Sequence, residues 1–109
     1  MSTTYHFLAA SAPFFEEHIV VEILEERTRH YARHGKPIDF WLVREPQFLE
    51  APQLAELSRR CPRPAAAIVS TDGRFIIWLK HRLQYVVTGS FEAPSPAIPE
   101  PLASRTPVR

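Results

Sequence analysis

The apolar residues of this chain fall into short runs separated by proline, glycine and polar residues, and each run has the length and pattern of a strand or a helix. Four runs predict strands because they are short and rich in apolar, aromatic or β-branched side chains: residues 5–10 (YHFLAA), 38–43 (IDFWLV), 65–69 (AAAIV) and 84–91 (QYVVTGSF). The second and third runs are apolar on both faces, so we expect those two strands to be covered on both sides.

Three segments have the pattern of helices. The longest covers residues 14–34, where apolar residues recur near helical spacing, glutamates occupy the first turn and arginines and histidines crowd the last. Gly35 suits the left-handed residue that follows a helix, and Pro37 prevents the helix from continuing. Two shorter helices are predicted over residues 51–60 and 74–83.

The predicted order is strand–helix–strand–helix–strand–helix–strand, which indicates the α+β class. We expect a single-domain α/β sandwich with about four strands in a central sheet, mixed or largely antiparallel, flanked by three or four helices. The direction of the last strand stays open, because a short link from the preceding helix allows it to pair either way. With 109 residues, the chain fits one domain.

Proline dominates the end of the chain and excludes regular secondary structure there. We therefore divide the chain into a compact α/β domain, residues 1–93, and a proline-rich extended tail, residues 94–109, packed partly on the domain. Ile98 and Leu102 are the expected anchors of the tail, since burying an aliphatic side chain is favourable. Residues 105–109 are expected to be mobile.

Composition and charge restrict the possible classes of protein. Hydrophobic residues make up 45% and charged residues 23%, which is ordinary for a globular protein. The formal net charge is only +1, so no nucleic-acid partner is expected. No apolar run approaches the roughly 20 residues that span a bilayer, and neither a signal peptide nor a transit peptide is expected. Cys61 is the sole cysteine, so no intramolecular disulfide can form.

The residue types that carry chemistry in enzymes form no recognisable set. His30 and His34 share a helix face, but two ligands do not make a metal site. None of the five histidines has a carboxylate three residues before it, as the Glu-x-x-His pattern of di-iron bundles requires. Cys61 precedes a proline and is interpreted as a small buried hydrophobe, and the glycines form no phosphate loop. We expect no catalytic residue, no metal and no cofactor.

Two charged residues need an explanation. Asp39 lies within an otherwise apolar predicted strand, where a carboxylate must be exposed at an edge, hydrogen-bonded or paired with a cation. Arg82 ends a predicted helix whose other face is apolar. The residues alone favour a structural role, in which Asp39 pairs with an arginine and fixes the fold.

Taken together, the segments resemble one family. The similarity is carried by residues 39–43 (DFWLV), 48–50 (FLE), 61–62 (CP), 66–71 (AAIVST), 75–76 (FI), 78–80 (WLK), 82–83 (RL), Gly89, 98–99 (IP) and 101–104 (PLAS). In this order and spacing the chain resembles the accessory protein family of the aerobic magnesium-protoporphyrin IX monomethyl ester (oxidative) cyclase, the small conserved-reading-frame family of cyanobacteria and plastids. The resemblance covers nearly the whole chain, and the combination of segments is more specific than any one of them.

The resemblance implies a non-catalytic accessory or assembly factor of chlorophyll biosynthesis, which associates with the catalytic di-iron subunit of the cyclase. Other chlorophyll-biosynthesis enzymes are further candidate partners. Family positions implicated in supporting the cyclase match Asp39, Phe40 and Arg82, and we add Trp78 as a fourth candidate for partner binding. The implied location is the cytoplasm of a cyanobacterium or the plastid stroma, with peripheral association with the thylakoid through the partner.

Two other functions are considered. The first is a tetrapyrrole-binding carrier or chaperone that delivers the porphyrin intermediate, with Phe40, Trp41 and Trp78 as a flat apolar face and Arg82 meeting a propionate. The second is an uncharacterised enzyme, which the absence of a convergent catalytic set in the sequence disfavours.

Overall fold

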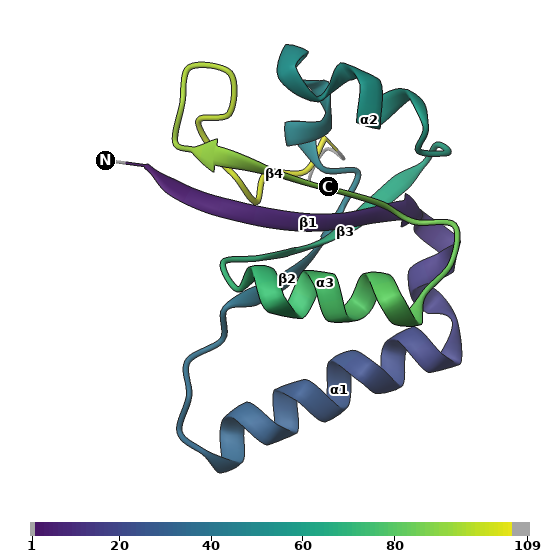
Figure 1. The fold of residues 1–109 in the computed structure, drawn as a ribbon, viewed down its shortest axis with the longest axis vertical. Coiled ribbons are helices and arrows are strands. Elements are labelled where there is room, and N and C mark those ends of the chain that lie inside the picture. The colour runs from purple at the N-terminus through teal and green to yellow at the C-terminus, as the bar shows by residue number, and fades with distance from the viewer. Residues whose placement is uncertain (1, 106–109) are drawn as a thin grey trace.

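A four-stranded sheet forms the middle of the molecule, in the order β2-β3-β1-β4. In the computed structural model, which describes residues 2–105, the strands are β1 (Thr3–Ser11), β2 (Phe40–Arg44), β3 (Ala65–Ser70) and β4 (Val87–Ala93). All three pairings between neighbouring strands are antiparallel, so the predicted α+β class is confirmed and the direction of the last strand is settled. Figure 1 shows the sheet between two unequal layers.

Three helices cover the sheet. The helices α1 (His18–Arg33) and α3 (Gly73–Arg82) lie on one side, and the short helix α2 (Ala55–Arg59) lies on the other with the proline-rich tail (Figure 1). Three short 3-10 turns complete the structure: η1 (Ala12–Glu16), η2 (Gln47–Glu50) and η3 (Pro52–Leu54). The helix predicted over residues 51–60 is therefore η3 followed by α2.

Two other predicted boundaries are wrong for local reasons. The longest helix begins at His18 and not at residue 14, because the preceding residues form the 3-10 turn η1 and Glu17 is extended, with φ −67° and ψ 143°. The last strand begins at Val87 and not at residue 84, because Tyr85 has a left-handed backbone with φ 64° that no strand accommodates.

The core has two layers because successive side chains of a strand point to opposite faces of the sheet. On the α2 side, three phenylalanine rings from β1, η2 and β4 pack together: Phe7 lies 4.9 Å from Phe48, and Phe48 lies 4.6 Å from Phe91. On the other side, Leu8 of β1 is buried in a second cluster beneath α1 and α3. Every residue of β3 is buried, which confirms the expected central strand.

The second predicted strand is covered on both sides only in part, and β2 forms an edge of the sheet. Phe40 and Val43 are buried on opposite faces, but Leu42 between them is exposed. The strand also begins two residues later than predicted, at Phe40, and Asp39 belongs to the connection from α1. The carbonyl of Asp39 accepts hydrogen bonds from the backbone N–H of Thr71 and from the Ser70 hydroxyl, which fix this connection to the end of β3.

The tail is held differently from the prediction. Ile98 is 2% exposed and joins the core cluster on the α2 side, as expected of an anchor, but Leu102 is 37% exposed and is no anchor. Backbone hydrogen bonds hold the tail instead, from Gln47 N–H to the Ala103 carbonyl (2.9 Å) and from Arg105 N–H to the Glu45 carbonyl (2.8 Å). Arg105 is therefore bound to the domain, and the remaining residues expected to be mobile lie outside the described part. The division of the chain at residue 94 stays a prediction.

Gly89 of β4 lies where the α2 side of the core leaves no room for a side chain. A β-carbon there would lie 2.7 Å from Cδ1 of Leu57 and 2.9 Å from Cζ of Phe7. Gly89→Ala is therefore expected to lower the free energy of unfolding by about 1–3 kcal/mol, measured by urea denaturation. Leu57→Ala should cost less in the Gly89→Ala background than in the native protein, because it removes the nearer clash. A Gly89→Ala protein as stable as the native one would contradict this packing.

Candidate functional site

Four aromatic rings form a continuous row under and between α1 and α3. We call Tyr31, Phe40, Phe75 and Trp78 the aromatic row. The ring of Tyr31 lies 5.5 Å from that of Phe40, Phe40 lies 5.5 Å from Phe75, and Phe75 lies 6.3 Å from Trp78. The first two contacts are edge-to-face and the third is stacked, and both arrangements are favourable for aromatic pairs at these distances.

Opposite charges stand at the two ends of the aromatic row. At one end, Oδ1 of Asp39 accepts a hydrogen bond from the Tyr31 hydroxyl at 2.8 Å, and Nζ of Lys36 lies 3.8 Å from Oδ2. At the other end, the guanidinium of Arg82 lies 4.3 Å from the centre of the Trp78 ring, which is a cation–π distance. The row therefore connects the four residues that we predicted for partner binding: Phe40 and Trp78 belong to it, and Asp39 and Arg82 contact its two ends.

Asp39 and Arg82 are linked through the row but do not touch. The carbonyl of Asp39 is hydrogen-bonded to Ser70 and Thr71, just before the N-terminal end of α3. Arg82 is the last residue of that helix. Ten helical residues span about 15 Å, so a direct ion pair between them is excluded. The expectation that Asp39 pairs with an arginine is wrong: its partners are the Tyr31 hydroxyl and the Lys36 ammonium group.

Arg27 of α1 joins the two helices and was not found by sequence reasoning. Its guanidinium lies 3.6 Å from the centre of the Phe75 ring. Its Nη2 donates to the Tyr31 hydroxyl at 2.6 Å and to Oδ2 of Asp72 at 3.3 Å. Asp72 is itself the N-cap of α3, where Oδ1 accepts the Arg74 N–H. The available signal was the spacing of Arg27 and Tyr31, which are four residues apart and so share a helix face.

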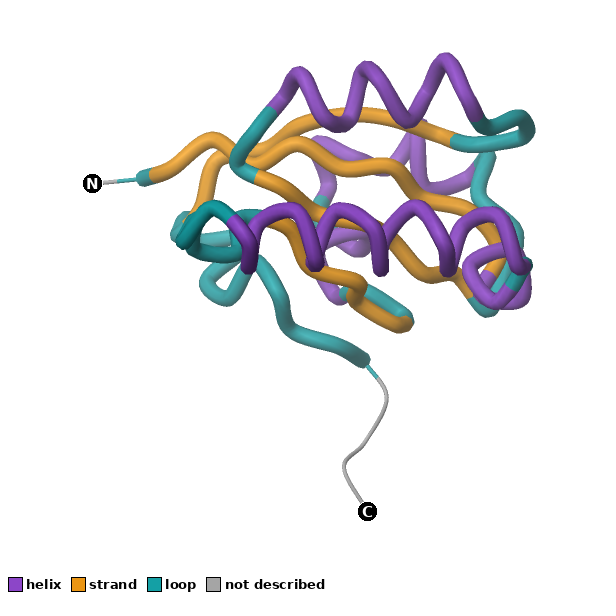
Figure 2. Tube along the Cα trace, turned by 90° about the horizontal axis from the view of Figure 1, so that it is seen from below, coloured by secondary structure: helices purple, strands orange, loops and turns teal. Residues whose placement is uncertain are grey.

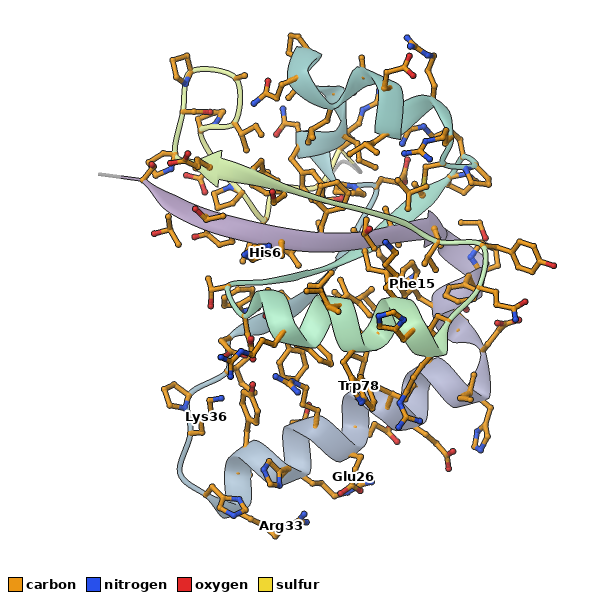
Figure 3. All side chains as sticks on the ribbon, viewed as in Figure 1. His6, Phe15, Glu26, Arg33, Lys36 and Trp78 are labelled. Atoms are coloured by element: carbon orange, nitrogen blue, oxygen red, sulfur yellow. The ribbon has the colours of Figure 1, made fainter. Side chains whose placement is uncertain are left out.

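The four predicted residues differ in their access to solvent. Phe40 is only 7% exposed, so it supports the surface from below and offers almost nothing to a partner. Trp78 is 42% exposed and Arg82 is an exposed residue. Trp78 lies on the side of α3 that faces α1 (Figure 3). The accessible part of the predicted site is thus the α3 end of the row, with Trp78 and Arg82.

A groove of about 960 Å³ runs between α1 and α3 beside this end of the row. The two helices lie side by side over one face of the sheet (Figure 2). The apolar part of the lining comes from Ile19, Ile23, Phe75 and Trp78, and the polar part from Glu22, Glu26, Arg27, His30, Asp72, Arg74, His81 and Arg82. The hydrogen bond from Arg29 lowers the pKa of Glu26 below its usual value.

The flat aromatic face expected for a tetrapyrrole carrier does not form. Phe40 packs in the core cluster under α1 and α3, but its strand neighbour Trp41 points to the other face of the sheet. Trp41 lines a separate depression with Leu42 and Leu102. Only Trp78 and Arg82 of the proposed carrier residues share an accessible surface.

The matching family is the Ycf54 protein family, whose profile aligns with residues 3–93. The chain belongs to the Ycf54 family. It is 53% identical to the Ycf54-like protein of Synechocystis over 104 residues, which cover 95% of this chain and 78% of that protein. It is 46% identical over 105 residues to the chloroplastic YCF54 protein of Arabidopsis thaliana, covering 94% of this chain and 48% of that longer protein.

Solved structures of similar proteins share the fold described above. The structure of the All0216 protein from Nostoc superimposes with a TM-score of 0.91 at 55% identity, covering 97% of this chain and 99% of that one. The Ycf54 protein of Synechocystis superimposes with a TM-score of 0.90 at 52% identity, covering 95% and 99%. The family therefore has cyanobacterial and chloroplastic members, as the sequence resemblance implied, and the solved cyanobacterial structures have this architecture.

Other groups in this Ycf54 chain offer little chemistry. Cys61 is buried, and burial raises the pKa of its thiol, which disfavours the reactive thiolate. Across residues 2–105, no three histidine, cysteine or acidic side chains come together as a metal-ligand set. Within the same residues, no helix has the length and apolar character needed to cross a membrane.

Proposed function

We propose that this chain is a non-catalytic accessory protein that binds and supports the di-iron magnesium-protoporphyrin IX monomethyl ester cyclase of chlorophyll biosynthesis. The cyclase role comes from the family resemblance, and the observation that supports it here is the exposed end of the aromatic row. Trp78 and Arg82 form a cation–π pair at the surface, next to a groove with an apolar lining. Tryptophan and arginine are the residues most enriched among those that dominate binding energy at protein interfaces.

Asp39 and Phe40 act in this proposal as supports of that surface. Asp39 holds the Tyr31 hydroxyl, and Phe40 fills the space between Tyr31 and Phe75. A substitution at either position weakens partner binding indirectly, because it displaces the rings of the aromatic row that support Trp78. The partner itself meets Trp78 and Arg82.

The test is capture of the catalytic di-iron subunit by alanine variants. Arg82→Ala is expected to weaken capture by an amount equivalent to about 2–5 kcal/mol, because a carboxylate of the partner would be left buried without its cation. Melting temperature should change little, since Arg82 is exposed and its guanidinium contacts the surface ring of Trp78. Lys80→Ala, an exposed cation on the same helix, is the matched control and should bind normally. Normal capture by Arg82→Ala and by Trp78→Ala would overturn the proposed function.

A tetrapyrrole carrier is the second candidate, favoured by one observation. The groove places an arginine beside the indole of Trp78, and a carboxylated macrocycle fits that combination. Titration of a Trp41→Phe chain with magnesium-protoporphyrin ester, followed by pigment absorbance and by quenching of the fluorescence of the remaining Trp78, separates the two. In the accessory role, the chain works in the cyanobacterial cytoplasm or the plastid stroma and reaches the thylakoid through its partner. Other enzymes of the pathway are further candidate partners.

A further inference from the structure

The charges that line the groove between α1 and α3 are unequally satisfied. Each groove carboxylate already has a basic side chain beside it within the fold: Glu22 has His18 at 3.3 Å, Glu26 has Arg29 at 3.0 Å and Asp72 has Arg27 at 3.3 Å. On the α3 side, Arg74, His81 and Arg82 also line the groove. None of these three has a carboxylate within ion-pair distance among residues 2–105. The groove therefore has basic side chains without an acidic partner on its α3 wall, whereas each of its carboxylates has a basic neighbour.

The apolar lining of the groove also lacks a cover. Ile19 on α1 is 58% exposed, and Trp78 opposite it on α3 is 42% exposed. Ile23 follows Ile19 by one helical turn on the same side of α1 and lines the groove as well. An apolar strip between two helices, bordered by unpaired cations, is complementary to a segment that is apolar on one side and acidic on the other.

The walls of the groove decide the conformation of that segment. Both walls are helices, whose backbone N–H and C=O groups are already bonded within each helix. An extended segment would find no backbone partners there and would leave its own polar groups unsatisfied. A helical segment satisfies its own backbone and presents only side chains. The ten residues of α3 span about 15 Å, which corresponds to nearly three turns of a bound helix.

We propose that this groove binds an acidic amphipathic helix of the partner, with apolar residues at i, i+3 or i+4 and i+7 packed on Ile19, Ile23 and Trp78, and carboxylates facing Arg74, His81 and Arg82. This inference rests on the proposed function for the identity of the partner and adds the chemistry of the segment that enters the site. The orientation of the helix is fixed by the charged α3 wall, because only one edge of the bound helix meets the unpaired cations.

The experiment measures binding of overlapping peptides that cover the sequence of the catalytic di-iron subunit, by fluorescence anisotropy against the full chain. The expected result is that the binding peptide is acidic, has the stated apolar spacing and gains helicity on binding, seen by circular dichroism. Ile19→Asp should weaken its binding at least tenfold. Ile77→Asp is the matched control, since Ile77 is also 58% exposed but does not line the groove. Melting temperatures of both variants verify that they fold.

The outcomes separate this inference from the function it builds on. Loss of subunit capture in Arg82→Ala, together with unchanged binding of peptide and subunit by Ile19→Asp, would overturn the groove proposal and leave the accessory function intact. A binding peptide that is basic or stays extended would also overturn it. If no peptide binds and magnesium-protoporphyrin ester quenches Trp78, the groove is a pigment site and the proposal is wrong. Weaker peptide binding by Arg74→Glu and Arg82→Glu supports the acidic edge, and so does weaker binding to the native chain at higher salt.

Discussion

Phe40→Ala should lower the free energy of unfolding by about 3–5 kcal/mol, the usual cost of removing a large aromatic side chain from a core. The ring is 7% exposed and lies edge-on to the rings of Tyr31 and Phe75. It also lies 5.5 Å from the Arg27 guanidinium. Its removal leaves a cavity in the middle of the aromatic row. Tyr31 at one end then no longer packs, through the Phe40 ring, on Phe75 and Trp78 at the other.

Urea denaturation followed by circular dichroism measures this effect, and Phe40→Leu is the matched control. Leucine fills more of the space than alanine, so its cost should be clearly smaller. Capture of the catalytic subunit should fall in Phe40→Ala together with stability, in contrast to Arg82→Ala, where capture falls and stability does not. A Phe40→Ala protein with native stability and lost capture would mean that Phe40 contacts the partner directly, against its burial.

Arg27→Ala is expected to lower the free energy of unfolding by about 2–3 kcal/mol. Breaking a fully buried ion pair typically costs 3–5 kcal/mol, and the smaller figure reflects the partial exposure of Arg27 and Asp72, 23% and 32%. The change removes the contact with Phe75 and the hydrogen bonds to Tyr31 and Asp72. Because these contacts join α1 to α3, amide hydrogen exchange should rise along α1 more than in the sheet.

Arg29→Ala is the control for charge and for helix position. Arg29 is also on α1, but it is 59% exposed and pairs only with Glu26 in the described structure, so its loss should change stability by less than about 1 kcal/mol. Arg27→Lys is informative as well, since a lysine keeps the charge and loses the planar group that lies on the Phe75 ring. Equal stability of Arg27→Ala and Arg29→Ala would contradict the bridging role.

The sequence pattern predicts the central part of the fold well, because a strand buried on both faces is apolar at every position. β3 is buried on both faces and its residues form an uninterrupted apolar run, so its place in the sheet could be predicted. β2 has a similar run apart from Asp39 but lies at the edge, and the carboxylate alone did not decide between an edge position and a buried hydrogen-bonded one. The edge position depends on which strands pair, which is a property of the whole chain.

The candidate site was predictable only where single residues conflict with their surroundings. Asp39 in an apolar run was such a conflict, and its carboxylate does accept a hydrogen bond from Tyr31 at one end of the aromatic row. Arg27 gave no such signal, because an arginine on an amphipathic helix is ordinary. Its contacts with Phe75 and Asp72 join residues far apart in the chain. The opposite facing of Phe40 and Trp41, by contrast, follows from the two-residue period of a strand, so their adjacency in the sequence already argued against a shared aromatic face.

The sheet order has a consequence for how this chain folds. β1, at the start of the chain, lies between β3 and β4, and Thr3 pairs with Ala93. β1 therefore leaves the ribosome before both of its partners and has neither of them until β3 and β4 have been made. Contacts between residues so distant in sequence slow folding, because the chain must close large loops before any pairing is gained. During synthesis β1 presents both hydrogen-bonding edges and the side chains of Phe7 and Leu8 to the cell, and it depends on the last strand for its protection.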